Sequence, residues 1–316
     1  QIRIIGSSDD DTLTLDNSNG LVKADVLYYG DGPFAGGGFD TLRLTGSTPT
    51  TTTYNPGSTQ GSGGVFQEND SIVQRVQFFG LEPVLVQGTG AGDSIVLGSA
   101  ALGAGFPQAL NADNAINYSE GPNSNQPLDP FFAGDITGMV TVDGYEVLEF
   151  SNFGTLDINA GSGSDVINLN NPELPTDLVD INVEGGDPTS GSDTVIVNGT
   201  AASDSIVVDS LTNDGATVTG AQPAVVNVDG AEDLIINGRG GDDFLEIETP
   251  SGNDDIEFFP GAQEDAGSVI ITRSGGGSNK LLPLAYTELG AFGELTFSDV
   301  DDVRTDTLTV SGSDND

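Results

Sequence analysis

The 316-residue chain contains no cysteine, no histidine and no tryptophan, and these absences exclude several classes of function. Without cysteine there is no disulfide framework, and without histidine or cysteine there is no zinc site of the usual ligand set. The same absences exclude Ser-His-Asp and Cys-His catalysis.

Positive charge is nearly as scarce, since 8 Lys and Arg stand against 49 Asp and Glu, which gives a formal net charge of −41. The basic residues are scattered singly along the chain, as Arg3, Lys23, Arg43, Arg75, Arg239, Arg273, Lys280 and Arg304. Nucleic acids and anionic membrane surfaces are bound by clustered Lys and Arg, so we expect neither as a partner. A body with this much like charge repels itself, which predicts either high salt or a calcium-bearing exterior as its surroundings.

Long hydrophobic runs are also absent. No apolar segment approaches the roughly 18 residues of a membrane span, and the first residues, QIRIIGSSDDD, do not read as a signal peptide. We therefore expect no membrane insertion. Because a reactive thiol is a liability outside the cell, the avoidance of cysteine favours an extracellular or cell-surface protein.

What the sequence does contain is a succession of short strands separated by Gly, Asp, Asn, Ser and Pro, which predicts an all-β fold. One local pattern recurs: a turn of glycine or small residues, an aspartate, any residue, and then an aliphatic residue. The copies are GSSDDDTLTL (6–15), GGGFDTLRL (36–44), GTGAGDSIVL (88–97), GSGSDVINL (161–169), SGSDTVIV (190–197), GTAASDSIVV (199–208), GRGGDDFLEI (238–247), SGNDDIEF (251–258) and RTDTLTV (304–310).

Where this pattern is clearest, apolar centres recur at a step of about nine to eleven residues, near 217, 226, 235, 245 and 256. A short strand and a turn fill that step in a parallel β-solenoid and in an antiparallel sandwich alike. We favour a parallel β-solenoid or β-helix built from irregular repeats, because the unit repeats in sequence and two-residue Asn-Gly hairpins do not set the spacing. Tandem antiparallel β-sandwich modules remain the alternative.

The repeats suggest three modules, at 1–87, 88–198 and 199–316, or one continuous elongated domain. Two stretches, 46–70 and 101–138, are rich in Gly, Pro, Ser, Thr and Asn and lack sustained alternation. We expect them to be loops outside the repeated core, the second inserted into the central module.

The copies GSGSDVINL and GRGGDDFLEI resemble the glycine- and aspartate-rich nonapeptide of RTX-type calcium-binding repeats, found in large exported bacterial surface proteins. The resemblance implies a parallel β-roll in which turn carboxylates and carbonyls bind Ca²⁺ and the aliphatic residues face the core. The chain departs from the pattern of that family, because its copies are degenerate and do not follow one another in tandem.

Carried onto this chain, the resemblance implies a set of calcium ligands at the turns. They are the aspartates Asp165, Asp193, Asp243 and Asp254, then Asp204 and Asp93, with the turn glycines Gly163 and Gly241. Hard Ca²⁺ prefers carboxylate and carbonyl oxygens, and glycine lets the backbone curl around an ion. The alternative is that each aspartate accepts hydrogen bonds from the amides of its own turn and needs no ion.

Carboxylate pairs also occur at Asp242-Asp243 and Asp254-Asp255, as acid/base catalysis of polysaccharide cleavage would require. Neighbours on a strand point to opposite faces, so these pairs do not converge on one substrate, and we do not expect an enzyme. The same alternation predicts that Leu245, Ile247 and Ile256 face the interior.

Aromatic doublets form another candidate site. They occur at Tyr28-Tyr29, Phe78-Phe79, Phe131-Phe132 and Phe258-Phe259, and one ring of each is expected to turn away from the core. Such rings could pack under a loop or contact a sugar or a neighbouring subunit.

The favoured interpretation is an extracellular structural repeat protein, part of a surface layer, filament or adhesin stalk, stabilised by calcium or salt. Strand-like sequence near both ends suggests head-to-tail self-association or a longer repeat array. The runner-up is a carbohydrate-binding or cell-adhesion module that uses the two predicted loops to bind a cell-surface glycan. A β-helix enzyme that cleaves polysaccharides comes third.

Overall fold

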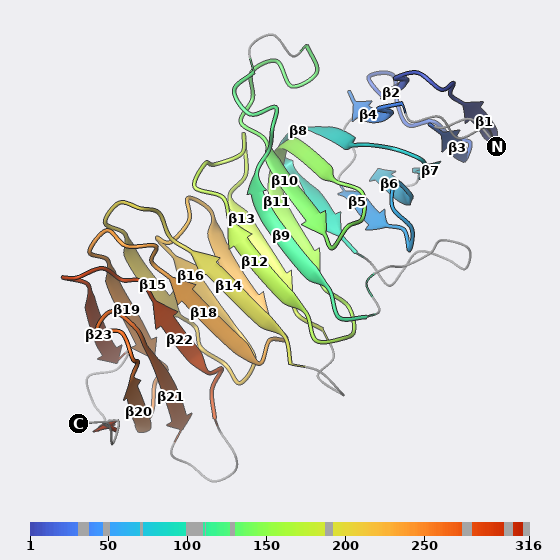
Figure 1. The fold of residues 1–316 in the computed structure, drawn as a ribbon. Helices are drawn as coiled ribbons and strands as arrows, with labels where there is room; N and C mark the ends of the chain where they lie inside the picture. Colours follow the sequence, from blue (N-terminus) through green and yellow to red (C-terminus); the bar gives the residue numbers. More distant parts are fainter. Residues whose placement is uncertain are drawn as a thin grey trace.

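The computed structural model describes residues 1–30, 38–46, 51–69, 72–98, 110, 112–126, 130–186, 192–273, 280–299 and 306–311. Every regular element in these ranges is a β-strand, and hydrogen bonds join the 24 strands into one open, mixed sheet (Figure 1). The all-β prediction is confirmed. These ranges contain no helix long and apolar enough to cross a membrane.

The strand pairing follows two rows that share β8 and β11. In hydrogen-bonding order, the first row is β1 (Ile2–Ile5), β3 (Val26–Tyr29), β7 (Ile72–Phe79), β6 (Gly63–Asn69), β5 (Thr51–Pro56), β8 (Val84–Leu97), β11 (Leu148–Asn159), β13 (Asp180–Glu184), β17 (Val225–Asp229), β16 (Ala216–Thr219), β15 (Ser205–Asp209), β19 (Phe244–Thr249) and β23 (Glu294–Asp299).

The second row is β2 (Thr12–Asp16), β4 (Thr41–Thr45), β8, β11, β10 (Gly138–Val142), β9 (Ala115–Glu120), β12 (Val166–Asn170), β14 (Thr194–Asn198), β18 (Asp233–Asn237), β22 (Leu284–Thr287), β21 (Gly267–Arg273), β20 (Asp254–Pro260) and β24 (Thr307–Val310). The long strands β8 and β11 pass from the second row to the first, and their pairing shifts register at that crossing, near Phe153.

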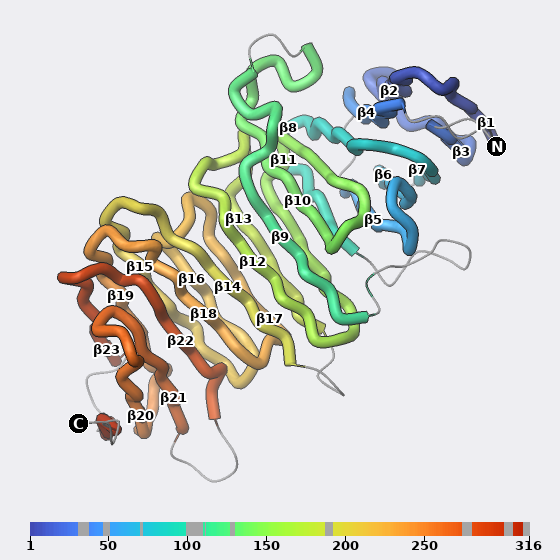
Figure 2. Tube along the Cα trace, viewed as in Figure 1, coloured from blue at the N-terminus to red at the C-terminus, as the bar shows by residue number. Residues whose placement is uncertain are grey.

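Within each row almost all strands run in the same direction. The exceptions are β6, β10, β16 and β21, each the middle strand of an antiparallel meander. Between the meanders the chain alternates between the rows, and the two chain ends lie at opposite ends of the stack (Figure 2). Because a meander adds strands between paired neighbours, the separation in sequence varies: Ile2 pairs with Val26, whereas Val84 pairs with Leu148. This variation explains why the repeat copies are unevenly spaced.

One hydrophobic core runs along both rows. Strands alternate between a buried and a more exposed face, as in β13, where Ile181 and Val183 are buried, and in β14, where Val195 and Val197 are. Residues from both rows join a single cluster of buried side chains. The predicted interior positions Leu245, Ile247 and Ile256 belong to this cluster, as alternation along a strand requires. The division into three modules stays a prediction.

The two predicted loops are partly wrong. The stretch 46–70 contains β5 and β6, and 101–138 contains β9 and the start of β10. Tyr54, Val65 and Ile116 from these strands are fully buried. The strands TTTYNP, GGVFQEN and AINYSE pair on both sides, so hydrogen bonding and packing override their Gly, Pro and Asn content. Parts of both stretches, 47–50 and 101–109 among them, lie outside the described residues.

Candidate functional site

The recurrent aspartates lie where strands begin. Most of them lie directly before a strand, whereas Asp254 is the first residue of β20 and Asp93 lies within β8, just before the part that pairs in the first row. The other aspartates and their strands are Asp11 (β2), Asp40 (β4), Asp165 (β12), Asp193 (β14), Asp204 (β15), Asp243 (β19) and Asp306 (β24). Since neighbouring strands are parallel and in register, these aspartates stack on one another from strand to strand.

Stacked acidic residues are joined by hydrogen bonds from backbone to carboxylate. The N–H of Asn114 donates to Oδ1 of Asp165 at 2.7 Å, the N–H of Asp165 to Oδ1 of Asp193 at 2.7 Å, and the N–H of Asp193 to Oε2 of Glu232 at 2.6 Å. A second hydrogen bond joins the same two strand starts in the reverse direction, because the carbonyl of Asp165 accepts from the N–H of Thr194. We call this arrangement the carboxylate ladder.

The ladder recurs at other strand starts. The N–H of Asp11 donates to Oδ1 of Asp40 at 2.8 Å, that of Asp204 to Oδ1 of Asp243 at 2.8 Å, and that of Asp254 to Oδ1 of Asp306 at 2.9 Å. A carboxylate oxygen here takes the place of the carbonyl that a continuing strand would supply. Buried backbone N–H groups need an acceptor, and a charged acceptor makes a strong hydrogen bond.

The turn aspartates are of two kinds. In the first, the turn opens with glycine and a hydroxyl residue, and the aspartate also accepts from that residue. Oδ2 of Asp93 accepts from the N–H of Thr89 at 2.8 Å and its hydroxyl at 2.7 Å, and Thr200 donates to Asp204 in the same way. Ser7 does so to Asp11. For these three turns the expected hydrogen bonding within the turn is observed.

In the second kind, no hydroxyl residue stands four positions before the aspartate, where Asp165 has Gly161 and Asp243 has Arg239, and a carboxylate oxygen has no partner. Oδ2 of Asp165 and Oδ2 of Asp243 lack a hydrogen-bond partner within the described ranges, and both aspartates are buried, at 0% and 1% exposure. Burial, with a smaller contribution from the nearby negative charge of Asp193, raises the pKa of Asp165 to about 6. Burial likewise raises the pKa values of Asp193, Asp243 and Asp254. These buried carboxylates favour a proton or a cation as a partner.

The turn glycines are required by close packing. A Cβ atom on Gly238 would overlap Oδ2 of Asp243. A Cβ on Gly163 would lie 2.6 Å from the carbonyl carbon of Ala112, and one on Gly241 would overlap the carbonyl of Ala202, each in the preceding turn. The glycines predicted beside a metal therefore lie where the backbones of successive turns meet.

The predicted calcium ligands are not gathered into one site. The structure joins Asp165 to Asp193, Asp204 to Asp243 and Asp254 to Asp306, whereas Asp93 binds its own turn. No three acidic residues in the described ranges form a group that could hold a metal ion. Ca²⁺ takes six to eight oxygen ligands, so the residues suit calcium in chemical type but do not form a closed cage. Calcium binding stays a prediction.

The acidic pairs diverge, as alternation predicts. Asp243 is buried and Asp242 exposed, and Asp254 is buried and Asp255 exposed. The two carboxylates of each pair therefore cannot act on one substrate from the same face of the sheet.

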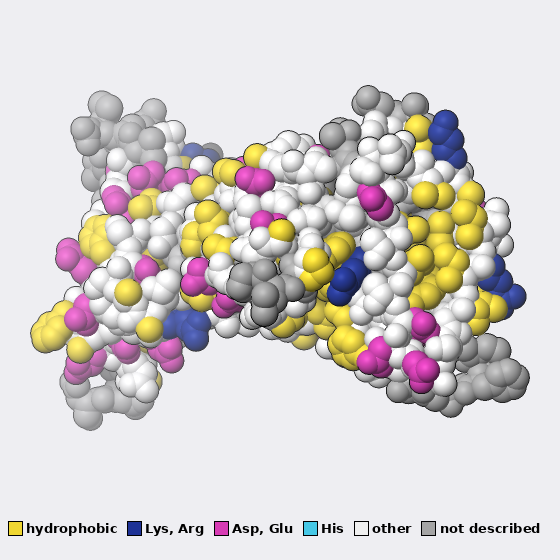
Figure 3. All heavy atoms as spheres, turned by 90° about the horizontal axis from the view of Figure 1, so that it is seen from above, with side chains coloured by type: hydrophobic (Ala, Val, Ile, Leu, Met, Phe, Trp, Pro, Cys, Tyr) yellow, Lys and Arg dark blue, Asp and Glu magenta, His cyan; other side chains and the backbone are white. Residues whose placement is uncertain are grey.

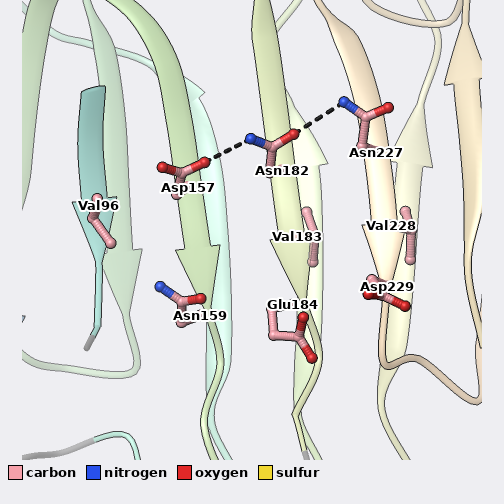
Figure 4. A pocket seen from close by; sticks show the side chains of 9 residues that line it. All are labelled: Val96, Asp157, Asn159, Asn182, Val183, Glu184, Asn227, Val228 and Asp229. Carbon is pink, nitrogen blue, oxygen red and sulfur yellow. Dashed lines mark hydrogen bonds between the residues drawn. The ribbon is translucent and has the colours of Figure 1, made fainter. Parts of the chain in front are cut away.

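Sequence reasoning missed a polar groove on the outer face of the first row. There Asn182 donates to Asp157 at 2.7 Å and Asn227 donates to Asn182 at 3.0 Å, so three strands carry one line of side chains (Figure 4). The groove, of about 380 Å³, is also lined by Val96, Asn159, Val183, Glu184, Val228 and Asp229. Burial and the charge of Asp229 raise the pKa of Glu184. The sequence has a polar residue at the equivalent outward position of each of these strands, but the positions can be recognised as equivalent only when the strand register is known.

The aromatic doublets divide as expected in two cases. Tyr28 and Phe78 are buried, whereas Tyr29 and Phe79 are half-buried and stack on the outer face, with ring centroids 5.1 Å apart. The guanidinium of Arg3 lies 5.0 Å from the Tyr29 ring centroid. The expectation is wrong for Phe131-Phe132, because both rings are buried in a small cluster with Leu85.

Comparison with known protein families, with curated proteins and with solved structures finds no match to this chain. The resemblance to RTX-type repeats therefore rests on the quoted motifs, and the function has to be argued from the geometry.

Proposed function

We propose that this chain is a structural protein of the cell exterior, forming part of a surface layer, a filament or an adhesin stalk. The observation that carries the proposal is the carboxylate ladder. The recurrent aspartates, such as Asp165 and Asp204, accept hydrogen bonds from backbone N–H groups of a neighbouring strand or their own turn. Their positions thus serve the stacking of strands, which is the requirement of a scaffold.

The finer fold we propose is a parallel β-solenoid interrupted by four antiparallel meanders. Its support is that parallel neighbours keep register, as where β14 pairs with β18 from Thr194 to Asn198, apart from the shift between β8 and β11 near Phe153. Sandwich modules centred on the meanders are the alternative. An elongated particle in solution scattering, with all segments unfolding together, favours the solenoid, whereas separate unfolding transitions for the meanders favour sandwich modules.

Calcium is the proposed stabilising ion. Two features favour the binding of a cation: the unpartnered carboxylate oxygens of Asp165 and Asp243, and the acidic surface (Figure 3). Asp and Glu side chains are spread over the face shown there, and one elongated particle keeps them apart better than a sphere would.

Thermal unfolding in three buffers tests this proposal. A chelated sample, a calcium sample and a sample with sodium chloride at equal ionic strength are compared. Stabilisation by calcium beyond that of sodium supports specific ions at the turns, because a ligand stabilises the state that binds it. Equal stabilisation by both salts indicates screening alone, and the structural role would then not depend on calcium.

A carbohydrate-binding or cell-adhesion module is the second candidate. The stacked Tyr29 and Phe79 rings with Arg3 beside them favour it, because aromatic rings with a polar neighbour contact sugars well. A glycan array with the intact chain and with Tyr29→Ala separates the two: binding that depends on Tyr29 supports the module, and no binding supports the scaffold. A polysaccharide-cleaving enzyme has no converging carboxylate pair to support it at Asp242-Asp243 or Asp254-Asp255.

A further inference from the structure

We propose that the polar groove on the outer face of the first row binds a neutral polysaccharide, whose chain crosses β11, β13 and β17. The inference goes beyond the structural role and does not depend on it. The groove is also separate from the Tyr29-Phe79 stack of the second candidate function, because β6, β5 and β8 lie between β7 and β11 in the first row.

Six polar side chains form the groove in two lines of three (Figure 4). They are Asp157, Asn182 and Asn227 in the first line, and Asn159, Glu184 and Asp229 in the second. The three members of each line are paired across neighbouring parallel strands, and the second line lies two residues further along each strand. With strands about 4.8 Å apart and a rise of about 3.3 Å per residue, the side chains form a grid of roughly 5 by 7 Å.

The first line supplies hydrogen-bond donors. The hydroxyl of Thr217 donates to Asn227 at 3.3 Å. Asn227 donates to Asn182 at 3.0 Å, and Asn182 donates to Asp157 at 2.7 Å, so all hydrogen bonds of the line run in one direction. An amide nitrogen carries two hydrogens, and each of these two asparagines uses one of them along the line. The second N–H of Asn182 and of Asn227 is therefore available to a ligand.

The second line supplies acceptors. Glu184 and Asp229 lie directly opposite each other on β13 and β17, and like charges in that position destabilise a sheet. Within the described ranges the Glu184 carboxylate accepts no hydrogen bond, and burial and the charge of Asp229 raise its pKa. Hydrogen-bond donors from a ligand would offset this repulsion.

A neutral sugar chain fits this arrangement because a hydroxyl group both donates and accepts hydrogen bonds. A sugar ring with hydroxyls on both edges can accept from the amides of the first line and donate to the carboxylates of the second, roughly 7 Å away. The grid repeats from strand to strand, which favours a polymer over a single sugar. An acidic sugar is disfavoured, because three of the described residues that line the groove are carboxylates and none is Lys or Arg.

The second row offers a comparison, because it also carries a line of asparagines. There Asn168 donates to Asn117 at 3.2 Å, and Asn198 donates to Asn168 at 2.7 Å. Two residues further along β9 and β12 lie Ser119 and Asn170, so no carboxylates stand beside this line. Lines of asparagines therefore join strands in both rows, and the line of carboxylates distinguishes the groove.

Substitutions in each line test the site. Glu184→Gln removes an acceptor charge, and Asn182→Leu removes a donor. The matched control is Asn168→Leu, which removes the same kind of amide from the line in the second row. Each protein is applied to an array of neutral, amino-sugar and uronic-acid oligosaccharides, and isothermal titration calorimetry at low and high salt measures the affinity for the neutral glycan bound most strongly. Circular dichroism checks that each variant keeps the fold.

The intact chain should bind neutral glycans and not uronic acids, with an affinity that salt leaves unchanged because the ligand carries no charge. Glu184→Gln should weaken binding at least about tenfold and Asn182→Leu about fivefold, since a hydrogen bond to a charged group is the stronger of the two. Asn168→Leu and Tyr29→Ala should bind as the intact chain does.

Three results would overturn the proposal in different ways. Binding that is lost in Tyr29→Ala but kept in both folded groove variants would place the glycan on the aromatic stack and support the second candidate function. Binding restricted to amino sugars and abolished by salt would show only a general attraction to the acidic surface. An intact chain that binds no glycan would remove both the groove and the second candidate, and would leave the structural role standing.

Discussion

The backbone N–H of Asp165 donates a 2.7 Å hydrogen bond to Oδ1 of Asp193, a residue 28 positions later that directly precedes the neighbouring strand β14. The carbonyl of Asp165 in turn accepts from Thr194. Successive strands are thus joined at their starting points by one carboxylate contact and one backbone contact. This relationship, repeated along the stack, gives the recurrent aspartates a structural purpose.

Replacing Asp165 by asparagine should stabilise the protein at pH 7. The amide oxygen can still accept from Asn114, and the substitution removes a buried negative charge whose second oxygen has no partner. We expect a gain on the order of 1 kcal/mol in the free energy of unfolding, measured by denaturant titration in chelator. A loss of that size in chelator would mean that the ionised form is the favoured one.

Asp204→Asn is the matched control, with the opposite expected sign. The Asp204 carboxylate accepts the N–H and the hydroxyl of Thr200, and a neutral amide oxygen makes weaker hydrogen bonds than a charged carboxylate. The variant should lose about 1 kcal/mol. If both substitutions stabilise the chain equally, the division of the turns into two kinds is wrong.

Acidification should stabilise the fold between about pH 7 and pH 4. Burial raises the pKa of Asp165 to about 6 from its usual 3.8, and that of Glu146 to about 7 from 4.5. A raised pKa in the folded state means that the native protein takes up the proton before the unfolded chain does. The resulting stabilisation is complete below the unfolded values and is lost as pH rises through the folded ones. Thermal melts across this range in chelator measure it, and a melting temperature that falls steadily on acidification from pH 7 to 5 would refute it.

Gly238→Ala should destabilise the chain by about 1 to 3 kcal/mol, because the added Cβ has to displace the Asp243 carboxylate. Gly92→Ala, in another glycine-aspartate turn, should change stability little, since a Cβ there meets nothing within 4 Å. Urea titrations of both variants provide the comparison. Equal losses would show that these glycines matter for backbone flexibility and not for the space beside the carboxylate.

The sequence predicted the features that depend on local pattern. Alternation in GRGGDDFLEI and SGNDDIEF placed Leu245 and Ile256 in the core, as the structure has them. The pattern placed Asp243 and Asp254 at turns, and the structure adds that they lie where strands begin. It failed where non-local pairing decides. Strand β5 has one buried hydrophobic side chain, Tyr54, and β9 has two, Ile116 and Tyr118, so their own pattern is short and the hydrogen bonds from neighbours on both sides are needed to fix them as strands.

The local sequence pattern also could not predict which residue each turn aspartate would bind. The acceptor of the Asp165 N–H lies 28 residues away and that of the Asp204 N–H lies 39 away, because the meanders change the length of chain between stacked strands. The line of Asp157, Asn182 and Asn227 was hidden for the same reason. Only the register brings these residues together.

Amide hydrogen exchange at Asp165 tests the carboxylate ladder most directly. In the intact chain this N–H should be protected, and in Asp193→Ala it should exchange at least about tenfold faster, because its acceptor is gone. The N–H of Val166 is the internal control, since it donates to the backbone carbonyl of Asn114 and should change much less. Unchanged protection at Asp165, or equal acceleration at both amides, would contradict the claim that turn carboxylates hold successive strands together.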